Sequence, residues 1–222
     1  MDDLKTYIYI SKSKIDPLFD QLIDQETTTT KELGLDIKLL KASLKSEVSK
    51  RDTLVSRLNA VVTHIRRDCN IGSVDNPSEY FEGRLRLKFG AAPKETDIKG
   101  GNHEMVIWGN EVAGTILGLS GSTWHLIGVK PAEQTGYGGS FTLTMYDHLT
   151  RAARDSDDSR HPPPSFLSER TFTDLMGRGL SRMLQDFYAE QNVEFLARKF
   201  DRFAFGDKWI LLGSPLYVAL AE

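Results

Sequence analysis

The stretch Tyr80-Phe-Glu-Gly-Arg-Leu-Arg-Leu-Lys-Phe89 decides the fold class. Its apolar residues Leu85, Leu87 and Phe89 alternate with basic residues, a period of two that is typical of a strand with one face in water. Two further short apolar runs, 105–108 and 115–119, follow with glycines at their borders. The central region therefore predicts an antiparallel meander with one wet face.

Towards the C-terminus, the pattern predicts a helix and then two more strands. Residues 171–187 are amphipathic at helical spacing, and Thr171 with Asp174 resembles a capping box. Small residues in that helix would let another element approach closely. Strands are expected at 193–200 and 209–220, joined through Gly206-Asp207, and Pro215 favours an edge or a bulge in the last one.

Towards the N-terminus, residues 6–11 predict a strand that runs into a polar turn. Asp16-Pro17 is a typical helix start, and Thr27–Thr30 is expected to end that helix. A second helix is predicted from Leu54 to about Arg67, with Asp52 or Thr53 as its cap. Two segments stay ambiguous: 33–48 fits a strand better than a helix, and 141–152 fits a helix while a strand remains open.

The grouping of these strands predicts the class α+β, a mostly antiparallel sheet with helices packed on one face, because strands and helices do not alternate regularly. The 222 residues, 40% hydrophobic and 27% charged, fit a single domain over 1–222 with an exposed loop around 155–164. The loop expectation rests on three aspartates and three consecutive prolines.

Charge and cysteine content narrow the function classes. The formal net charge of -3 gives no clear nucleic-acid signature and no general attraction to a membrane surface. A lone cysteine, Cys69, excludes an intramolecular disulfide and suits a reducing compartment. Neither a signal peptide nor a long apolar run is visible. The expected location is therefore the cytoplasm, with no membrane partner.

The best local candidate for a ligand site is Ser11-Lys12-Ser13-Lys14. Hydroxyl and ammonium donors here follow a hydrophobic strand and precede a helix, where free backbone amides and the helix dipole favour anions. The segment lacks the glycines of a P-loop, and a purely structural turn is an equally good interpretation.

Basic residues on the central strand form a second candidate. Arg84, Arg86 and Lys88 share one face, and Lys41 with Lys45 would do so if 35–46 is a strand. An anionic small molecule such as a nucleotide is a coherent ligand for them. The competing and favoured interpretation is a solvated face of an antiparallel sheet.

Evidence for catalysis is weak. Ser122 and His125 place a hydroxyl near an imidazole, yet there is no G-x-S-x-G elbow and no acidic residue to orient the histidine. Gly136–Ser140 is more typical of a flexible loop than of a phosphate cradle. The five histidines lack ligand spacing, so no metal site is predicted, and no cofactor is identified.

Three segments resemble a bacterial family of unknown function. They are Tyr7-Ile-Tyr-Ile-Ser-Lys-Ser-Lys-Ile-Asp16, Gly72-Ser-Val-Asp-Asn-Pro77 with Tyr80 and Gly83, and the C-terminal Val193-Glu-Phe-Leu-Ala-Arg198 with Leu212-Gly-Ser-Pro-Leu-Tyr-Val-Ala219. The resemblance spans nearly the whole chain and implies a self-contained module in bacterial signalling or antiviral defence. It supplies no catalytic residue.

Two function classes follow. We expect a non-catalytic binding or sensor module for an anionic, nucleotide-like small molecule or a protein partner. The alternative is a hydrolase acting on a phosphorylated or nucleotide substrate. Whether the protein is an enzyme stays open, because no set of nucleophile, base and orienting residue stands out.

Overall fold

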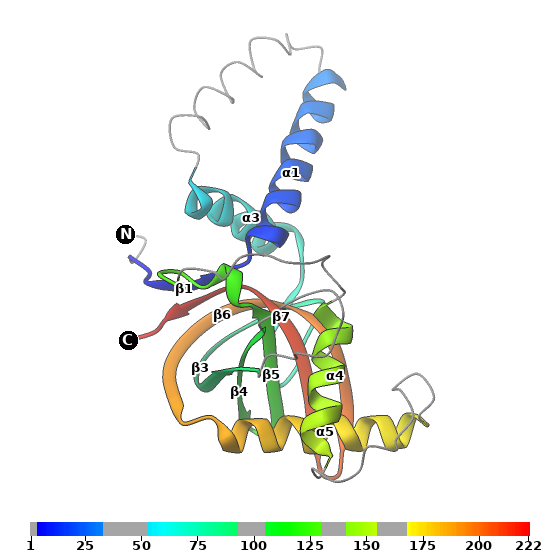
Figure 1. The fold of residues 1–222 in the computed structure, drawn as a ribbon. Helices are drawn as coiled ribbons and strands as arrows, with labels where there is room; N and C mark the ends of the chain where they lie inside the picture. The colour runs from blue at the N-terminus through cyan, green and yellow to red at the C-terminus, as the bar shows by residue number, and fades with distance from the viewer. Residues whose placement is uncertain (1–3, 33–52, 93–104, 130–140, 155–167) are drawn as a thin grey trace, which may run out of the picture. The chain divides into compact units, whose positions relative to one another are not determined.

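The computed structural model describes five segments of the chain: residues 4–32, 53–92, 105–129, 141–154 and 168–222 (Figure 1). The chain divides into two compact units, residues 10–70 and residues 1–9 with 71–222, which we call the helical unit and the sheet unit. The ambiguous segment 33–48 and the proline-rich segment 155–164 lie outside the described residues. The expectation of a single domain stays a prediction.

The sheet contains seven strands, and five of them pair in a closed circuit. The circuit runs β3–β4–β5–β7–β6 and returns from β6 to β3, because β3 pairs with both β4 and β6. We call these five strands the closed sheet. β1 lies beside β7, and the short β2 lies beside β3. The strand bounds are β1 Tyr7–Ile10, β2 Ile71–Gly72, β3 Tyr80–Ala91, β4 Met105–Val112, β5 Thr115–Ser122, β6 Ala189–Phe205 and β7 Lys208–Leu220.

The predicted α+β class with a mostly antiparallel sheet is confirmed. Four of the pairings in the closed sheet are antiparallel, and β5 pairs with β7 in parallel. The antiparallel neighbours β4 and β5, and likewise β6 and β7, are joined by two-residue connections. A two-residue loop can join only antiparallel strands, because parallel strands need a crossover connection of about a dozen residues or more.

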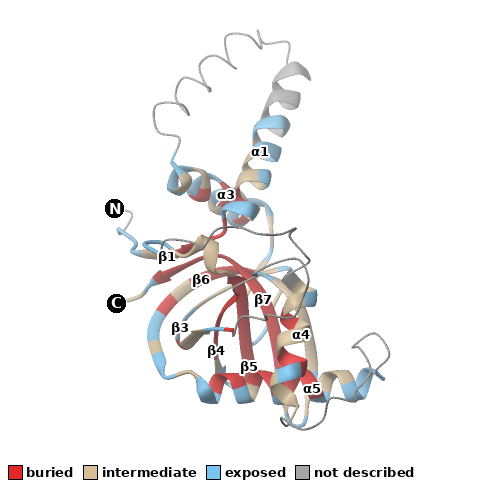
Figure 2. Ribbon diagram, in the orientation of Figure 1, coloured by how far each residue is buried: buried red, intermediate tan, exposed pale blue. Residues whose placement is uncertain are grey.

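The interior of the closed sheet is a hydrophobic cluster to which all five of its strands contribute (Figure 2). The largest side chains that these five strands contribute are Trp108, Phe81 and Phe195, each at most 1% exposed, and Tyr9 of β1 joins the same cluster. The rings of Phe81 and Phe195 meet edge to face with their centroids 5.9 Å apart. Alternation along each strand therefore directs one set of side chains inward, where apolar burial stabilises the fold.

The outer face of the sheet packs against two helices, α4 (Phe141–Ala153) and α5 (Glu169–Asp186). The helical interpretation of 141–152 is thus confirmed. Helix α5 begins earlier than predicted, because Ser168 rather than Thr171 is its N-cap: the Ser168 hydroxyl accepts a hydrogen bond from the Thr171 amide at 3.3 Å. The expected close approach of α5 to another element is also found, since Gly179 lies against the Leu149 carbonyl of α4.

Both short connections place residues at positive φ. Ala113 and Gly114, between β4 and β5, have φ of 48° and 76°, and Gly206 between β6 and β7 has φ of 63°. Positive φ at such positions matches the right-handed twist of a hairpin. Pro215 lies at a register shift in the pairing of β6 with β7, so the bulge expectation is confirmed, whereas the edge expectation is wrong because β7 has neighbours on both sides.

The helical unit contains α1 (Lys12–Glu32) and α3 (Leu54–Asp68). Thr53 caps α3, and Leu58, Val61 and Ile65 are its buried face, as predicted. Among the described residues, no helix has both the length and the apolar character needed to cross a membrane.

Two predictions about α1 are wrong. The helix begins at Lys12, one turn before the predicted Asp16-Pro17 start, because the Ser11 carbonyl already accepts hydrogen bonds from the amides of Lys14 and Ile15 at 3.0 and 2.9 Å. The helix also continues through Thr27–Thr30. Threonine lowers helix propensity by only about 0.7 kcal/mol or less per residue, which weakens a helix without ending it.

Candidate anion-binding site

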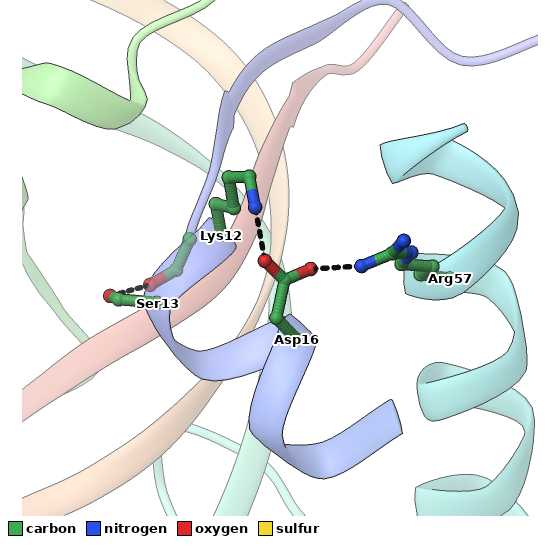
Figure 3. Close-up of polar contacts among 5 residues, drawn as sticks. Lys12, Ser13, Asp16 and Arg57 are labelled. Atoms are coloured by element: carbon green, nitrogen blue, oxygen red, sulfur yellow. Dashed lines mark hydrogen bonds and ion pairs between the residues drawn. The ribbon is translucent and has the colours of Figure 1, made fainter. Parts of the chain in front are cut away.

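The first candidate, Ser11–Lys14, occupies the N-terminus of α1 (Figure 3). Ser11 is fully buried, whereas Lys12 and Ser13 are exposed. The Ser11 hydroxyl accepts a hydrogen bond from Lys14 Nζ at 3.2 Å and lies 3.5 Å from the Ser13 hydroxyl oxygen. Hydroxyl and ammonium groups from all four positions are therefore concentrated in the first turn of one helix.

Lys14 is the unusual member of this group. Burial lowers the pKa of its ammonium from 10.5 to about 8, because desolvation disfavours the charged form. The first turn of α1 contains no acidic residue. The positive end of a helix dipole is an unfavourable place for a cation and a favourable place for an anion. At neutral pH the protein thus holds a partly desolvated positive charge where the helix itself opposes it.

Asp16 connects this turn to α3. Its carboxylate pairs with Lys12 and, on its other oxygen, with Arg57 Nη1 at 3.0 Å (Figure 3). The Lys12 ammonium and then the Arg57 guanidinium lower the pKa of the Asp16 carboxyl. One carboxylate is therefore shared between two cations. Sequence reasoning gave Asp16 only a capping role, although the four-residue spacing from Lys12 was a readable signal of the pair.

The second candidate, the basic face of β3, is placed on the closed sheet. Arg86 Nε pairs with Glu190 at 2.8 Å, and Arg84 donates to the Glu222 carbonyl oxygen. Lys88 Nζ donates to the Leu184 carbonyl at 2.9 Å, near the C-terminal end of α5. A cation there interacts favourably with the helix dipole.

The strand opposite β3 supplies matching acidic residues. In the register of β3 with β6, Glu194 lies opposite Arg84 and Glu190 lies opposite Lys88. Opposite charges on neighbouring strands stabilise the pairing by about 0.2–1 kcal/mol. This arrangement gives the β3 face a structural role and makes it the weaker of the two anion candidates. Lys41 and Lys45 lie outside the described residues.

Ser122 and His125 border a short 3-10 helix, Thr123–His125. The Ser122 hydroxyl caps that helix by accepting from the Trp124 amide at 3.3 Å. The His125 ring meets the buried ring of Tyr9 edge to face, with centroids 5.9 Å apart. These contacts account for both residues by local capping and packing, and none of them prepares a nucleophile.

The remaining sequence candidates add no further chemistry. Across the described segments, no group of three or more His, Cys, Asp or Glu residues is placed to hold a metal ion. Cys69 is a free cysteine and follows α3. The Gly136–Ser140 segment lies outside the described residues.

The chain is an α+β protein. The lysine-containing N-terminus of α1 belongs to the helical unit, and the closed sheet belongs to the sheet unit. The chain belongs to the family of unknown function DUF7019, which matches residues 5–222. The expected membership of such a family is thereby confirmed. No curated protein and no solved structure matches the chain.

Proposed function

We propose that the protein is a non-catalytic binding module whose α1 N-terminus, Ser11–Lys14, receives an anionic small molecule of nucleotide type. The observation that carries the proposal is the desolvated Lys14 ammonium, with its pKa lowered to about 8, at the positive end of a helix. An anion bound there would interact with the Lys14 ammonium, the Lys12 ammonium and the positive end of the α1 dipole.

The cost of this arrangement supports a binding role over a purely structural one. A charged group that is desolvated beside a like-signed helix terminus lowers the stability of the empty protein. Functional sites often retain groups that lower the stability of the folded protein. On this proposal the module acts in the cytoplasm of a bacterium, in a signalling or defence system, as the family resemblance implies.

Calorimetric titration tests the proposal. Wild type is titrated with inorganic phosphate and with a panel of linear and cyclic nucleotides, at low and moderate salt. We expect at least one anion to bind, more weakly as salt rises because exposed charges are screened. In the double variant Lys12→Ala/Lys14→Ala we expect affinity to fall at least tenfold.

A matched control is available on β3. The variant Arg84→Ala/Arg86→Ala removes two positive charges from the second candidate, and it should leave the affinity within about twofold of wild type. Failure of every anion to bind wild type would overturn the proposal, and so would unchanged affinity in the double lysine variant. Loss of binding in the β3 variant alone would move the site to that strand.

A hydrolase remains the alternative function, and no contact described above favours it. Ser122 and His125 serve capping and packing, as shown by the Trp124 amide and the Tyr9 ring. The same panel tests the alternative: release of phosphate or a change in the nucleotide during incubation would support hydrolysis over simple binding.

A further inference from the structure

Two serine hydroxyls interrupt the apolar outer face of the closed sheet. Ser120 on β5 and Ser214 on β7 are both fully buried, with 0% of their surface exposed. Within the described part of the chain, neither hydroxyl oxygen has a hydrogen-bond partner. The hydrophobic cluster on this face is formed mainly by β4, β5, β7, α4 and α5, and partly buried phenylalanines of β6 pack against it.

The two serines are neighbours on adjacent strands. The parallel pairing of β5 with β7 extends to Leu119 opposite Gly213, and Ser120 and Ser214 are the next residues on each strand. They also point to the same side, because alternation places Ser120 with Ile116 and Ser214 with Leu212, both members of the outer cluster. Two unpartnered hydroxyls therefore face the same apolar region.

Nearby geometry shows why these hydroxyls differ from other buried ones. Thr150 on α4 is equally buried, at 1% exposed, and its hydroxyl donates to the Tyr146 carbonyl at 2.7 Å one turn earlier. A helix offers such a carbonyl to every threonine or serine. A strand offers no carbonyl one turn earlier, and neither the Ser120 nor the Ser214 hydroxyl reaches another acceptor or donor among the described residues.

Leaving both hydroxyls without partners is energetically expensive. An unpaired buried hydroxyl costs about 1–3 kcal/mol relative to a paired one. Buried polar groups in proteins are almost always satisfied, and where no protein group is in reach the partner is an ordered molecule, most often water with about three hydrogen bonds. A serine pair on one face supplies two of those bonds.

We infer that Ser120 and Ser214 together bind one small neutral guest between the β5–β7 face and the helices that cover it. The guest is a hydrogen-bond donor and acceptor, and water is the smallest molecule of that class. A charged guest would lose its hydration among the aliphatic and aromatic side chains of this face, and the Asp201 carboxylate beside Leu212 already accepts a hydrogen bond from the Tyr146 hydroxyl at 3.1 Å. This site is independent of the anion site proposed at Ser11–Lys14.

Stability measurements on Ser120→Ala, Ser214→Ala and the double variant test the inference. If a guest joins the hydroxyls, each single variant should lower the folding equilibrium constant at least threefold. The double variant should then lower it by less than the product of the two single effects, because either substitution already removes one shared guest. Truly unpartnered hydroxyls predict the opposite: each alanine leaves stability unchanged or raises it, which would overturn the inference.

Two measurements on wild type keep the test independent of how well the variants fold. A crystal structure at atomic resolution should show density within hydrogen-bond distance of both Oγ atoms, and empty space or a direct Ser120–Ser214 contact would overturn the inference. Native mass spectrometry identifies the guest. If the crystal structure shows density and the measured mass equals that of the chain alone, the guest is water. If the measured mass exceeds that of the chain by a discrete amount, the guest is a larger neutral ligand.

Discussion

At the scale of single residues, the informative positions are those whose surroundings oppose them. Lys14 holds a desolvated charge at the positive end of a helix, and Ala113 adopts a positive φ of 48° that a residue with a Cβ rarely adopts. Neither conflict can be read from composition or periodicity, because both depend on where the backbone actually turns. Each of them predicts a substitution that stabilises the protein.

Lys14→Met should stabilise the protein at neutral pH. The methionine keeps a similar length and removes the desolvated charge, so we expect the free energy of unfolding at pH 7 to rise by about 1–3 kcal/mol, the equivalent of one to two pKa units. Urea unfolding measures this change. A destabilised variant would instead show that the Lys14 stem and its bond to Ser11 hold the turn together.

The same variant predicts a change in pH dependence. The pKa of Lys14 is lowered in the folded state to about 8 from its ordinary value of 10.5. Between these values the unfolded chain binds more protons than the folded one, so wild-type stability gains a contribution as pH rises from about 8 to 10. The difference in stability between Lys14→Met and wild type should therefore shrink over that range. A constant difference across it would contradict the prediction.

Ala113→Gly should also stabilise the protein. Glycine adopts positive φ without the steric cost that alanine carries, and this gain exceeds the added entropy of the unfolded chain, for a net rise of about 0.5–1 kcal/mol in the free energy of unfolding. Ala60→Gly is the matched control, because Ala60 is an exposed residue inside α3. There the same replacement should destabilise by about 1 kcal/mol. Equal signs for the two variants would contradict this account of the turn.

At the scale of elements, the strands and helices were largely predictable and their ends were not. The alternation of Leu85, Leu87 and Phe89 and the apolar stripe of α3 are local patterns, and both elements formed where expected. The start of α1 was misjudged because Asp16-Pro17 is a typical first turn in isolation. In the structure the helix is extended backwards to Lys12 by the carbonyl of a buried serine, Ser11, whose burial is a tertiary property.

The packing of α4 against α5 gives a prediction at this scale. A Cβ at Gly179 would lie 1.9 Å from the Leu149 carbonyl oxygen, a backbone atom that cannot move without shifting α4. Alanine favours a helix over glycine by about 1 kcal/mol, but the overlap should dominate. Gly179→Ala should therefore destabilise by about 2 kcal/mol, in the range of other overpacked core positions.

Thermal or urea unfolding measures the effect of Gly179→Ala. Ser181→Ala on the same helix is the control, since Ser181 is only half-buried and alanine suits a helix interior. It should leave stability unchanged or slightly higher. A stabilised Gly179→Ala variant would show that α4 and α5 separate readily and that their close approach is not required.

At the scale of the whole molecule, closure of the sheet is the feature that sequence reasoning missed. Each strand was visible as a pattern, but closure depends on β3 pairing with β4 at one end and with β6 along most of its length. The β3–β6 pairing joins residues a hundred or more positions apart, such as Phe89 and Ala189, and no local pattern encodes it. The candidate site was likewise proposed from its residue types, serines and lysines that follow a strand. The burial that distinguishes Lys14 could not be predicted from the sequence, because it depends on tertiary packing.

Closure makes β7 indispensable, which is the last prediction. β7 lies between β5 and β6, and its residues Ile210, Leu211, Leu212 and Val218 are all fully buried. Deleting residues 208–222 would expose their neighbours, at about 1.5–3 kcal/mol for each lost core side chain, and would leave β5 and β6 as open edges prone to pairing with other chains. We expect the truncated protein to lose cooperative unfolding and to aggregate, measured by urea denaturation and by light scattering after gel filtration.

Deleting residues 221–222 alone is the control, because β7 ends at Leu220, and it should cost only the few hydrogen bonds that those residues make with Asn192 and Arg84. A soluble, cooperatively folded monomer without 208–222 would show that the remaining strands form a stable core on their own, and closure would then not be the source of the stability of the sheet.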